Sequence, residues 1–257
     1  MRLFATGVLP VCVGRATRVV EYLHDSRKTY IATLRLGAET STGDTEGETI
    51  SAGSFEGVEH ADIQAVLPRF VGTILQEPPV YSALKVAGVP AYERARRGED
   101  LVLEARPVEV FGIAVQSFDP PDLVVQVRCG RGTYIRALAR DIGRALGCGA
   151  HLTALRRTAV GSLHIPVTPR ELEHAAEGGT LGEFLLPIDV GLTGRPAALL
   201  SADSENDLLH GRRLYFEPAW AAEQCVAYSE AGTVLGILER QEDAWRPRIV
   251  FSGGSNA

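Results

Sequence analysis

The sequence predicts an α+β protein with a second, smaller β-rich domain at its C-terminal end. Three observations lead to this expectation. Two β-rich runs, 107–116 and 123–129, flank the turn sequence D-P-P-D at 119–122, which is typical of an antiparallel hairpin. Runs with apolar residues at helical spacing lie on both sides of this hairpin along the chain. The composition changes at 191–196, a G-L-T-G-R-P segment that is typical of a linker.

Periodicity places the elements that precede the hairpin. Apolar residues recur at helical spacing over 15–25 and again over 63–71, although Pro68 interrupts the second run. Alternation over 30–36 predicts a strand, with Tyr30 on its more apolar face. The remaining expectations are a loop at 40–44 after Gly37, an extended segment with a Pro-Pro pair at 76–81, and a short helix through Tyr92 and Arg96 that stops at Gly98. The apolar helical positions are Val19, Val20 and Leu23 in the first run and Ile63, Val66, Leu67, Phe70 and Val71 in the second.

A further helix is expected directly after the sequence G-R-G-T-Y at 130–134, with Thr133 as its N-cap. Arg136, Arg140 and Arg144 recur at every fourth residue, so they project from one face of this helix. The glycines and the helix N-terminus offer backbone N–H groups to an anion. The buried stripe is expected to be Ile135, Leu138, Ala139, Ile142 and Leu146, and a strand is expected over 151–157.

The segment after the linker is expected to fold as a separate domain. We place the boundary so that a larger domain covers 1–194 and a small one covers 195–257. A chain of roughly sixty residues with this pattern predicts a small β-barrel or sandwich, which is often an accessory binding module. Its expected elements are a helix over 200–211 and strands over 226–228, 234–238 and 248–251.

Composition excludes several classes of protein. Hydrophobic residues make up 45% of the chain and the mean hydropathy is +0.03, values that are ordinary for a soluble globular protein. No run reaches the ~18 consecutive apolar residues of a membrane span, so we expect no membrane contact. The four cysteines are far apart and form no CxxC or His-x-Cys cluster. We therefore expect no disulfide, no metal site and a reducing, cytoplasmic location.

Charge is distributed unevenly along the chain. The formal net charge is −6, and all but two of the 26 basic residues are arginines. The stretch 39–62 holds seven acids and no lysine or arginine, whereas 128–157 holds seven arginines and the single acid Asp141. This asymmetry favours a face that meets a polyanion, because arginine binds phosphate through two bonds and stacks on bases. A solvated helix face is the alternative interpretation of the same run.

Four segments carry a specific combination of residues in a fixed order. They are 5–17 (ATGVLP…GRAT), 28–47 (KTY…LG…TSTGDTEG), 78–96 (PPVYSALK…YERAR) and 132–157 (GTYIR…LGCGAH…LRR). Each segment alone is a weak signal. Together they resemble the bacterial tRNA pseudouridine synthases of the TruB type, which isomerise uridine 55 in the T-loop. The resemblance covers about residues 4–190, and the tail is similar to the small PUA-type RNA-binding domain of that family.

The resemblance implies a pseudouridine-synthase fold, with a mixed, largely antiparallel central sheet flanked by helices, and a site that holds a uridine extruded from folded RNA. Tyr30 is then the stacking platform beneath the uracil and takes part in moving its C5 proton. Tyr134 and Leu155 line the pocket, Arg136 pairs with the catalytic carboxylate, and Asp44 is a loop acid of the second motif. Without the resemblance, a strand tyrosine, two packing residues, a solvated arginine and a turn aspartate are ordinary structural residues.

The resemblance also implies how the RNA and the reaction are handled. An Asp carboxylate attacks, the glycosidic bond breaks, and the base turns and rejoins through C5, so neither metal nor organic cofactor is needed. Contacts with RNA phosphates make binding strongly salt-dependent. The residues expected to meet phosphates are Arg140, Arg144, Arg156 and Arg157.

The sequence departs from the family at one important position. The TruB type carries its nucleophilic Asp in a Leu-Asp-Pro segment directly before the position of Phe4, and Arg2 stands there in this sequence. The family's preceding segment, with a first strand and a loop histidine, has no counterpart. We therefore expect the chain as written to be inactive, and interpret it as a normal enzyme with a defective or wrongly delimited N-terminus. Arg136 is expected to lose its anionic partner, at a cost of roughly 3–5 kcal/mol if it is buried.

Several functions remain open at this point. The first is a monomeric tRNA pseudouridine synthase whose partner is the T-arm stem-loop. The second is a non-catalytic tRNA-binding or tRNA-folding protein of the same fold, which predicts salt-sensitive binding without isomerisation. A third hypothesis, a generic phosphate-binding enzyme that uses 130–133, is weakly supported, because the sequence has no Walker lysine and no GxGxxG. A guide-RNA-dependent relative of the same superfamily is a further alternative, against which the compact C-terminal tail argues.

Overall fold

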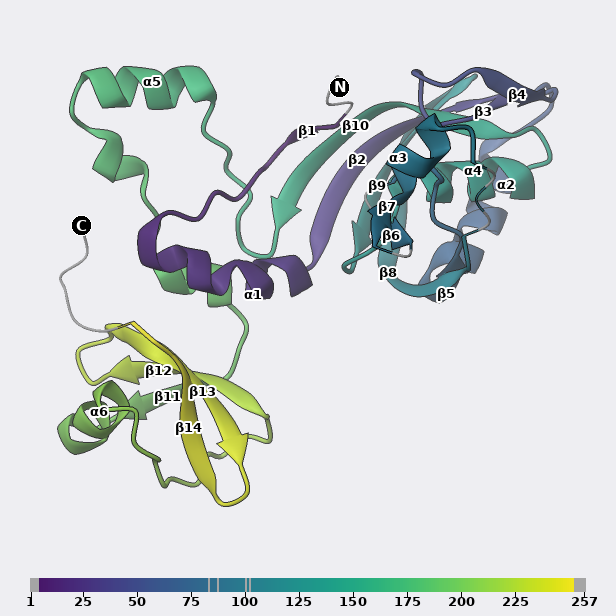
Figure 1. The fold of residues 1–257 in the computed structure, drawn as a ribbon. Helices are drawn as coiled ribbons and strands as arrows, with labels where there is room; N and C mark the ends of the chain where they lie inside the picture. The colour runs from purple at the N-terminus through teal and green to yellow at the C-terminus, as the bar shows by residue number, and fades with distance from the viewer. Residues whose placement is uncertain (1–4, 83, 87, 100, 102, 252–257) are drawn as a thin grey trace. The chain divides into compact units, whose positions relative to one another are not determined.

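The computed structural model describes residues 5–82, 84–86, 88–99, 101 and 103–251. By its packing the chain forms two units (Figure 1). The first contains Met1–Leu9 and Asp25–Val160, and the second contains Pro10–His24 and Gly161–Ala257. The expected α+β class is confirmed, as is a β-sheet in the C-terminal part. This grouping by contacts differs from the division at 194–195, which stays a prediction about folding domains.

A six-stranded sheet forms the centre of the first unit. Its strands are β1 (Ala5–Gly7), β2 (Lys28–Leu36), β5 (Gly72–Gln76), β8 (Arg106–Asp119), β9 (Asp122–Cys129) and β10 (Ala150–Val160). They lie in the order β1-β10-β2-β9-β8-β5, with β1 parallel to β10 and the other neighbours antiparallel. The expected mixed, largely antiparallel sheet is therefore confirmed. The predicted hairpin is β8–β9, and both of its strands are longer than expected.

Helices cover one face of this sheet. They are α2 (His60–Val66), continued by the 3-10 turn η2 (Leu67–Phe70), and α4 (Ile135–Ala145), while the short α3 (Ala91–Arg96) lies elsewhere in the unit. The core contains Ile63 of α2, the predicted apolar stripe of α4, and the inward residues of β2 and β9. Side chains of a strand alternate between its two faces, and β2 shows this pattern. Leu34 and Leu36 are buried, whereas Arg35 between them is exposed.

The start of α4 differs from the expectation. Tyr134, not Thr133, is the N-cap residue, and no side chain caps the helix from that position. The hydroxyl of Thr133 instead donates to the carbonyl oxygen of Gly130, within the preceding turn. A side chain that completes a turn in this way is not available to cap the helix, which begins one residue later than predicted.

Two small antiparallel pairs complete the first unit. They are β3 (Ala38–Thr40) with β4 (Thr49–Ala52), and β6 (Lys85–Val86) with β7 (Val89–Pro90). The loop between β3 and β4 contains most of the loop that the sequence predicted at 40–44, whereas the two strands were not expected. An isolated bridge between Asp44 and Leu152 places this loop against β10.

The second unit joins an early segment of the chain to the C-terminal part. Its sheet has the order β11-β12-β13-β14, and β11 was not expected from the sequence. The first predicted helix begins as a 3-10 turn, so Tyr22 is buried where Val20 was expected and Val20 is 38% exposed. No helix within the described part of the chain has both the length and the apolar character to cross a membrane. The elements are η1 (Gly14–Val19), α1 (Val20–Asp25), α5 (Pro169–Glu177), η3 (Leu181–Phe184), η4 (Ile188–Leu192), β11 (Ala197–Leu200), α6 (Ala202–Leu209), β12 (Gln224–Ser229), β13 (Val234–Gln241) and β14 (Ala244–Val250).

Candidate active site

Tyr30 lies on the core-facing side of β2, where β2 pairs with β10. It is in register with Arg157, and Leu155 is in register with Ala32. Residues that face each other across antiparallel strands share one face of the sheet, so Tyr30, Leu155 and Arg157 are neighbours. Tyr30 and Leu155 are both half-buried against the main core. The structure therefore brings together three of the residues that the sequence singled out.

The surroundings of Tyr30 keep its phenol protonated at neutral pH. Burial raises the pKa of Tyr30 above its ordinary value, and a hydrogen bond with the Arg157 side chain opposes that shift. Arg157 also donates from Nε to the carbonyl oxygen of Val8 at 2.7 Å. These two contacts engage part of its guanidinium within the protein. Arg156, by contrast, is exposed and lies in register with Ile31 on the opposite face of the sheet.

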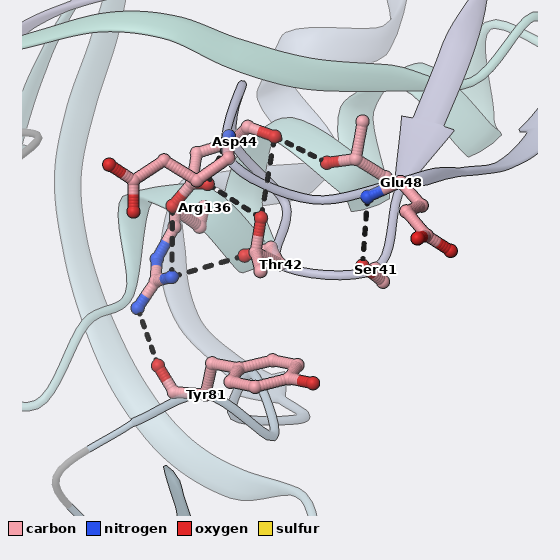
Figure 2. A network of polar contacts seen from close by, with 8 residues as sticks. Ser41, Thr42, Asp44, Glu48, Tyr81 and Arg136 are labelled. Atoms are coloured by element: carbon pink, nitrogen blue, oxygen red, sulfur yellow. Dashed lines mark hydrogen bonds and ion pairs between the residues drawn. The ribbon is translucent and has the colours of Figure 1, made fainter. Parts of the chain in front are cut away.

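Arg136, in the first turn of α4, is the centre of a polar network (Figure 2). Its guanidinium lies 3.0 Å from a carboxylate oxygen of Asp44. It also donates to the backbone oxygens of Thr42 at 3.1 Å and Tyr81 at 2.8 Å. Gly43 is required here, because a Cβ at this position would lie 3.2 Å from the Cβ of Arg136 and the glycine has a φ of +74°. Two loops distant in sequence are therefore held on one arginine.

Asp44 is almost fully buried, and both of its carboxylate oxygens accept hydrogen bonds. One oxygen accepts from the hydroxyl of Thr42 and from the backbone N–H of Glu46, and the other faces Arg136. The side chain of Asp44 is 6% exposed and that of Arg136 is 24% exposed. The expectation that Arg136 lacks an anionic partner is therefore wrong, because Asp44 supplies one.

Tyr134 is half-buried at the N-terminus of α4, and a residue that the sequence did not single out determines its position. The side-chain oxygen of Gln76 accepts the backbone N–H of Tyr134 at 2.8 Å. Gln76 is the last residue of β5 and is only 1% exposed. Nothing in the local pattern distinguishes a capping glutamine that acts on a helix 58 residues away. The only signal was its place at the start of the extended segment 76–81 that contains the Pro-Pro pair.

The other two arginines of the α4 face are also paired. Arg140 lies 2.8 Å from Asp141 and donates to the backbone oxygen of Glu77 at 3.2 Å. Arg144 forms two bonds with Glu39, at 2.8 and 2.7 Å. The prediction that the three arginines share one face agrees with these contacts, since each reaches toward the loops that cover α4. Their charge is largely neutralised within the protein by acids of the predicted acidic stretch and by Asp141.

The two groups of candidate residues border the same core. Tyr30 and Leu155 pack against it from the sheet, and Ile135, between Tyr134 and Arg136, is part of it. Arg2, where the nucleophile was implied, lies outside the described residues. The described residues thus form an aromatic and aliphatic surface on β2 and β10. Beside the start of α4 they form a partly buried cation, Arg136, whose orientation is set by three acceptors.

Comparison of the sequence with known families gives two adjoining matches. Residues 3–135 match the family described as TruB family pseudouridylate synthase (N terminal domain). The chain belongs to the TruB family. Residues 136–193 match the tRNA pseudouridylate synthase B C-terminal domain, so TruB sequence continues through α4, β10 and α5. Membership confirms the predicted enzyme class, a pseudouridine synthase.

Individual relatives agree with this assignment. A protein of Burkholderia lata named tRNA pseudouridine synthase B is 42% identical over 261 residues, which covers 96% of this chain and 79% of the relative. A protein of the same name from Pseudomonas aeruginosa is 43% identical over 244 residues, covering 93% and 80%. Among solved structures, a Cbf5-Nop10-Gar1 complex contains a chain with a TM-score of 0.72 and 23% identity, covering 97% of this chain and 72% of the other. That likeness shows that the TruB chain shares the fold of Cbf5.

Proposed function

We propose that the site built around Tyr30 and Arg136 isomerises uridine to pseudouridine in tRNA, at position 55 of the T-loop. The observation that carries this proposal is the TruB match over 3–193 together with the oriented guanidinium of Arg136. Relatives that are named tRNA pseudouridine synthase B and are about 40% identical support tRNA as the substrate class.

The residues present have defined roles in this proposal. A uridine within a folded loop must be extruded before its ring can be reached. Tyr30 stacks on the extruded uracil, and Leu155 and Tyr134 enclose the ring. Because the Tyr30 phenol is neutral at pH 7, it presents a polar but uncharged group to the base. Arg136 orients the carboxylate that attacks the ribose–uracil unit, and Asp44 keeps Arg136 in position.

Phosphate contacts are proposed for Arg140, Arg144, Arg156 and Arg157. Arg156 is the most available of the four, since it is exposed and has no ion pair among the described residues. Arg144 is 54% exposed despite its pairing with Glu39. These contacts predict that RNA affinity falls steeply with salt. A monomer in the cytoplasm, bound to the T-arm without metal or cofactor, completes the proposal.

The nucleophile is the part of the proposal that the chain as written does not supply, because Arg2 occupies the implied position of the Asp. We expect no turnover in an assay of tritium release from tRNA labelled at uracil C5. We expect turnover from a chimera in which the first four residues are replaced by the corresponding N-terminal segment of the Burkholderia lata relative. Turnover by the chain as written would show that another residue acts as nucleophile.

A non-catalytic tRNA-binding protein of the same fold is the second candidate. It is favoured because Arg2 stands in the sequence where the nucleophilic Asp is implied. It predicts salt-sensitive tRNA binding by the chain and no isomerisation by the chimera. The fluorescence anisotropy of a labelled T-arm stem-loop, measured at two salt concentrations beside the tritium assay, separates the two candidates. Absence of both binding and turnover in the chimera would contradict both.

A further inference from the structure

Glu39 and Arg144 form the most enclosed two-bond ion pair of the described residues outside the Arg136 network. The guanidinium of Arg144 donates from Nε and Nη2 to the two carboxylate oxygens of Glu39, at 2.8 and 2.7 Å. The side chain of Glu39 is 10% exposed and that of Arg144 is 54% exposed. The hydrogen bond with Glu39 raises the pKa of Arg144. A fork of this geometry fixes direction as well as distance, unlike a single charge contact.

The pair joins α4 to a hairpin that cannot be stable alone. β3 and β4 contain three and four residues, and two short strands need support from the rest of the fold. The backbone N–H of Gly37 donates to Gly149, and Nδ1 of His151 lies 2.9 Å from the oxygen of Ala38. These contacts hold the base of the hairpin. Glu39 is the only charged residue of β3.

The same helix face holds the tip of the hairpin. Asp44, in the loop between β3 and β4, pairs with Arg136, and Glu39, in β3, pairs with Arg144. Arg136 and Arg144 are eight residues apart, so they lie on one face of α4 at a separation of about 12 Å along its axis. The hairpin is therefore attached to α4 at two points. Attachment at Arg144 therefore adds a second restraint on the hairpin, about 12 Å along α4 from the point where Asp44 meets Arg136.

We propose that Glu39 and Arg144 are positioning residues of this site, which hold the β3–β4 hairpin in register on α4 so that Asp44 orients Arg136. Neither residue touches the reacting atoms in this account. The proposal builds on the proposed function, because Arg136 matters for catalysis only if the site isomerises uridine. The link from Glu39 to Arg136 is nevertheless a property of the protein without RNA.

Charge reversal tests this link. In the full chain, Glu39→Arg and Arg144→Glu each place two like charges together, whereas the double variant restores an ion pair in the opposite sense. We expect each single variant to accelerate amide hydrogen exchange about tenfold at Gly43, Glu46 and Leu152, whose N–H groups hold the loop. We expect the double variant to return these rates to within about threefold of the unmodified chain.

The guanidinium of Arg136 gives a second readout. In arginine-labelled protein, we expect its N–H signals to shift and to exchange faster with water in each single variant, and to recover in the double variant. A pair with only a local stabilising role would lower the melting temperature and leave the Arg136 signals unchanged, which would overturn the proposal. Failure of the double variant to restore the loop would overturn it as well.

Asp122→Arg is the matched control. Asp122 and Arg35 also form a two-bond pair, at 2.9 Å for both bonds, at the C-terminal end of β2, where Arg35 lies four residues before Glu39 in the chain. We expect its reversal to leave the amide hydrogen exchange of the 41–48 loop unchanged.

Kinetics of the chimera give a third readout. In the chimera described above, we expect Glu39→Arg to lower kcat about tenfold with KM within about twofold. If the chimera has no activity, the proposed function fails, while the exchange and Arg136 measurements still decide the role of Glu39.

Discussion

The Asp44–Arg136 pair differs from a surface ion pair because both partners are held by further bonds. Asp44 accepts two hydrogen bonds besides the one from Arg136, and Arg136 donates to two backbone oxygens. Desolvation makes such a pair costly to form, but removing one partner leaves the other charge stranded. Exposed pairs contribute little by comparison, since water and salt screen them.

We therefore predict that Asp44→Asn lowers the free energy of unfolding by about 2–3 kcal/mol, below the ~3–5 kcal/mol of a fully buried pair because Arg136 is partly exposed. Asn retains an acceptor for Thr42 and Glu46, but its amide nitrogen replaces the oxygen that accepts from Arg136, so the variant removes both the charge and that hydrogen bond. Urea unfolding measures the loss. Asp122→Asn, at the more exposed pair with Arg35, is the control and should cost about 0–1 kcal/mol. Equal losses at the two positions would contradict this account.

The resemblance identified Tyr30, Asp44 and Arg136 as site residues, but the pattern could not show what each one contacts. Pairing depends on which segments meet in three dimensions, and Asp44 and Arg136 are 92 residues apart. The sequence predicts phosphate ligands among the arginines of α4 from an uncompensated run of charge, whereas the acids that pair with these arginines cannot be identified from the sequence. Gln76 was missed for the same reason.

At the scale of elements, α4 shows how a predictable amphipathic helix acquires constraints that periodicity does not contain. Its buried stripe follows from spacing alone. The close contact of Gly143 with the turn into β10 does not follow from spacing. A Cβ at Gly143 would lie 2.2 Å from the backbone nitrogen of Ala150 and 2.5 Å from its Cβ. The glycine allows the close approach of helix and turn.

We predict that Gly143→Ala destabilises the protein. Alanine gains about 1 kcal/mol in helix propensity, but the overlap with Ala150 forces a backbone shift that costs about 1–3 kcal/mol or more, so the clash prevails. The expected result is a lower melting temperature, measured by circular dichroism. Gly182→Ala, where no atom lies within 4 Å of the added Cβ, should leave the melting temperature nearly unchanged. A stabilised Gly143→Ala would show that the turn moves aside freely.

At the scale of the whole molecule, each packed unit contains at least one buried thiol, and all four cysteines are free. Burial raises the pKa of Cys129, in the first unit, to about 11, and that of Cys225, in the second, to about 12. An unfolded chain releases these protons near pH 9, so between pH 9 and 12 the folded chain binds more protons than the unfolded one. The free energy of unfolding therefore falls as the pH rises through this range.

We predict that Cys129→Ala and Cys225→Ala each make this fall shallower, by up to about 1.4 kcal/mol per pH unit and thiol. Urea unfolding at pH 8, 9.5 and 10.5 measures the slope. Comparison with the unmodified chain at each pH cancels the titration of tyrosines and of Lys28, whose pKa burial lowers. Slopes that do not differ between variant and parent would show that these thiols titrate normally in the folded state.

The fold class, the β8–β9 hairpin and α4 followed from the sequence because each depends on local periodicity or turn chemistry. The assignment of segments to units did not follow. The run at 15–25 has an ordinary amphipathic pattern, and nothing in it shows that Val19 and Tyr22 pack with Ile237 and Ile249 rather than with β2, which follows directly in the chain. Such partners are set by the tertiary fold and not by spacing.

That placement of 10–24 has a consequence for biosynthesis. A ribosome completes Val19 and Tyr22 more than 200 residues before it adds Val226 and Ile249, against which they finally pack. During most of translation this short segment remains without its apolar partners. A protease that cuts after Val160 would, in the finished protein, leave two fragments that still share one hydrophobic core. The second unit is therefore the last part of the chain to be completed, although some of its residues are among the first to be made.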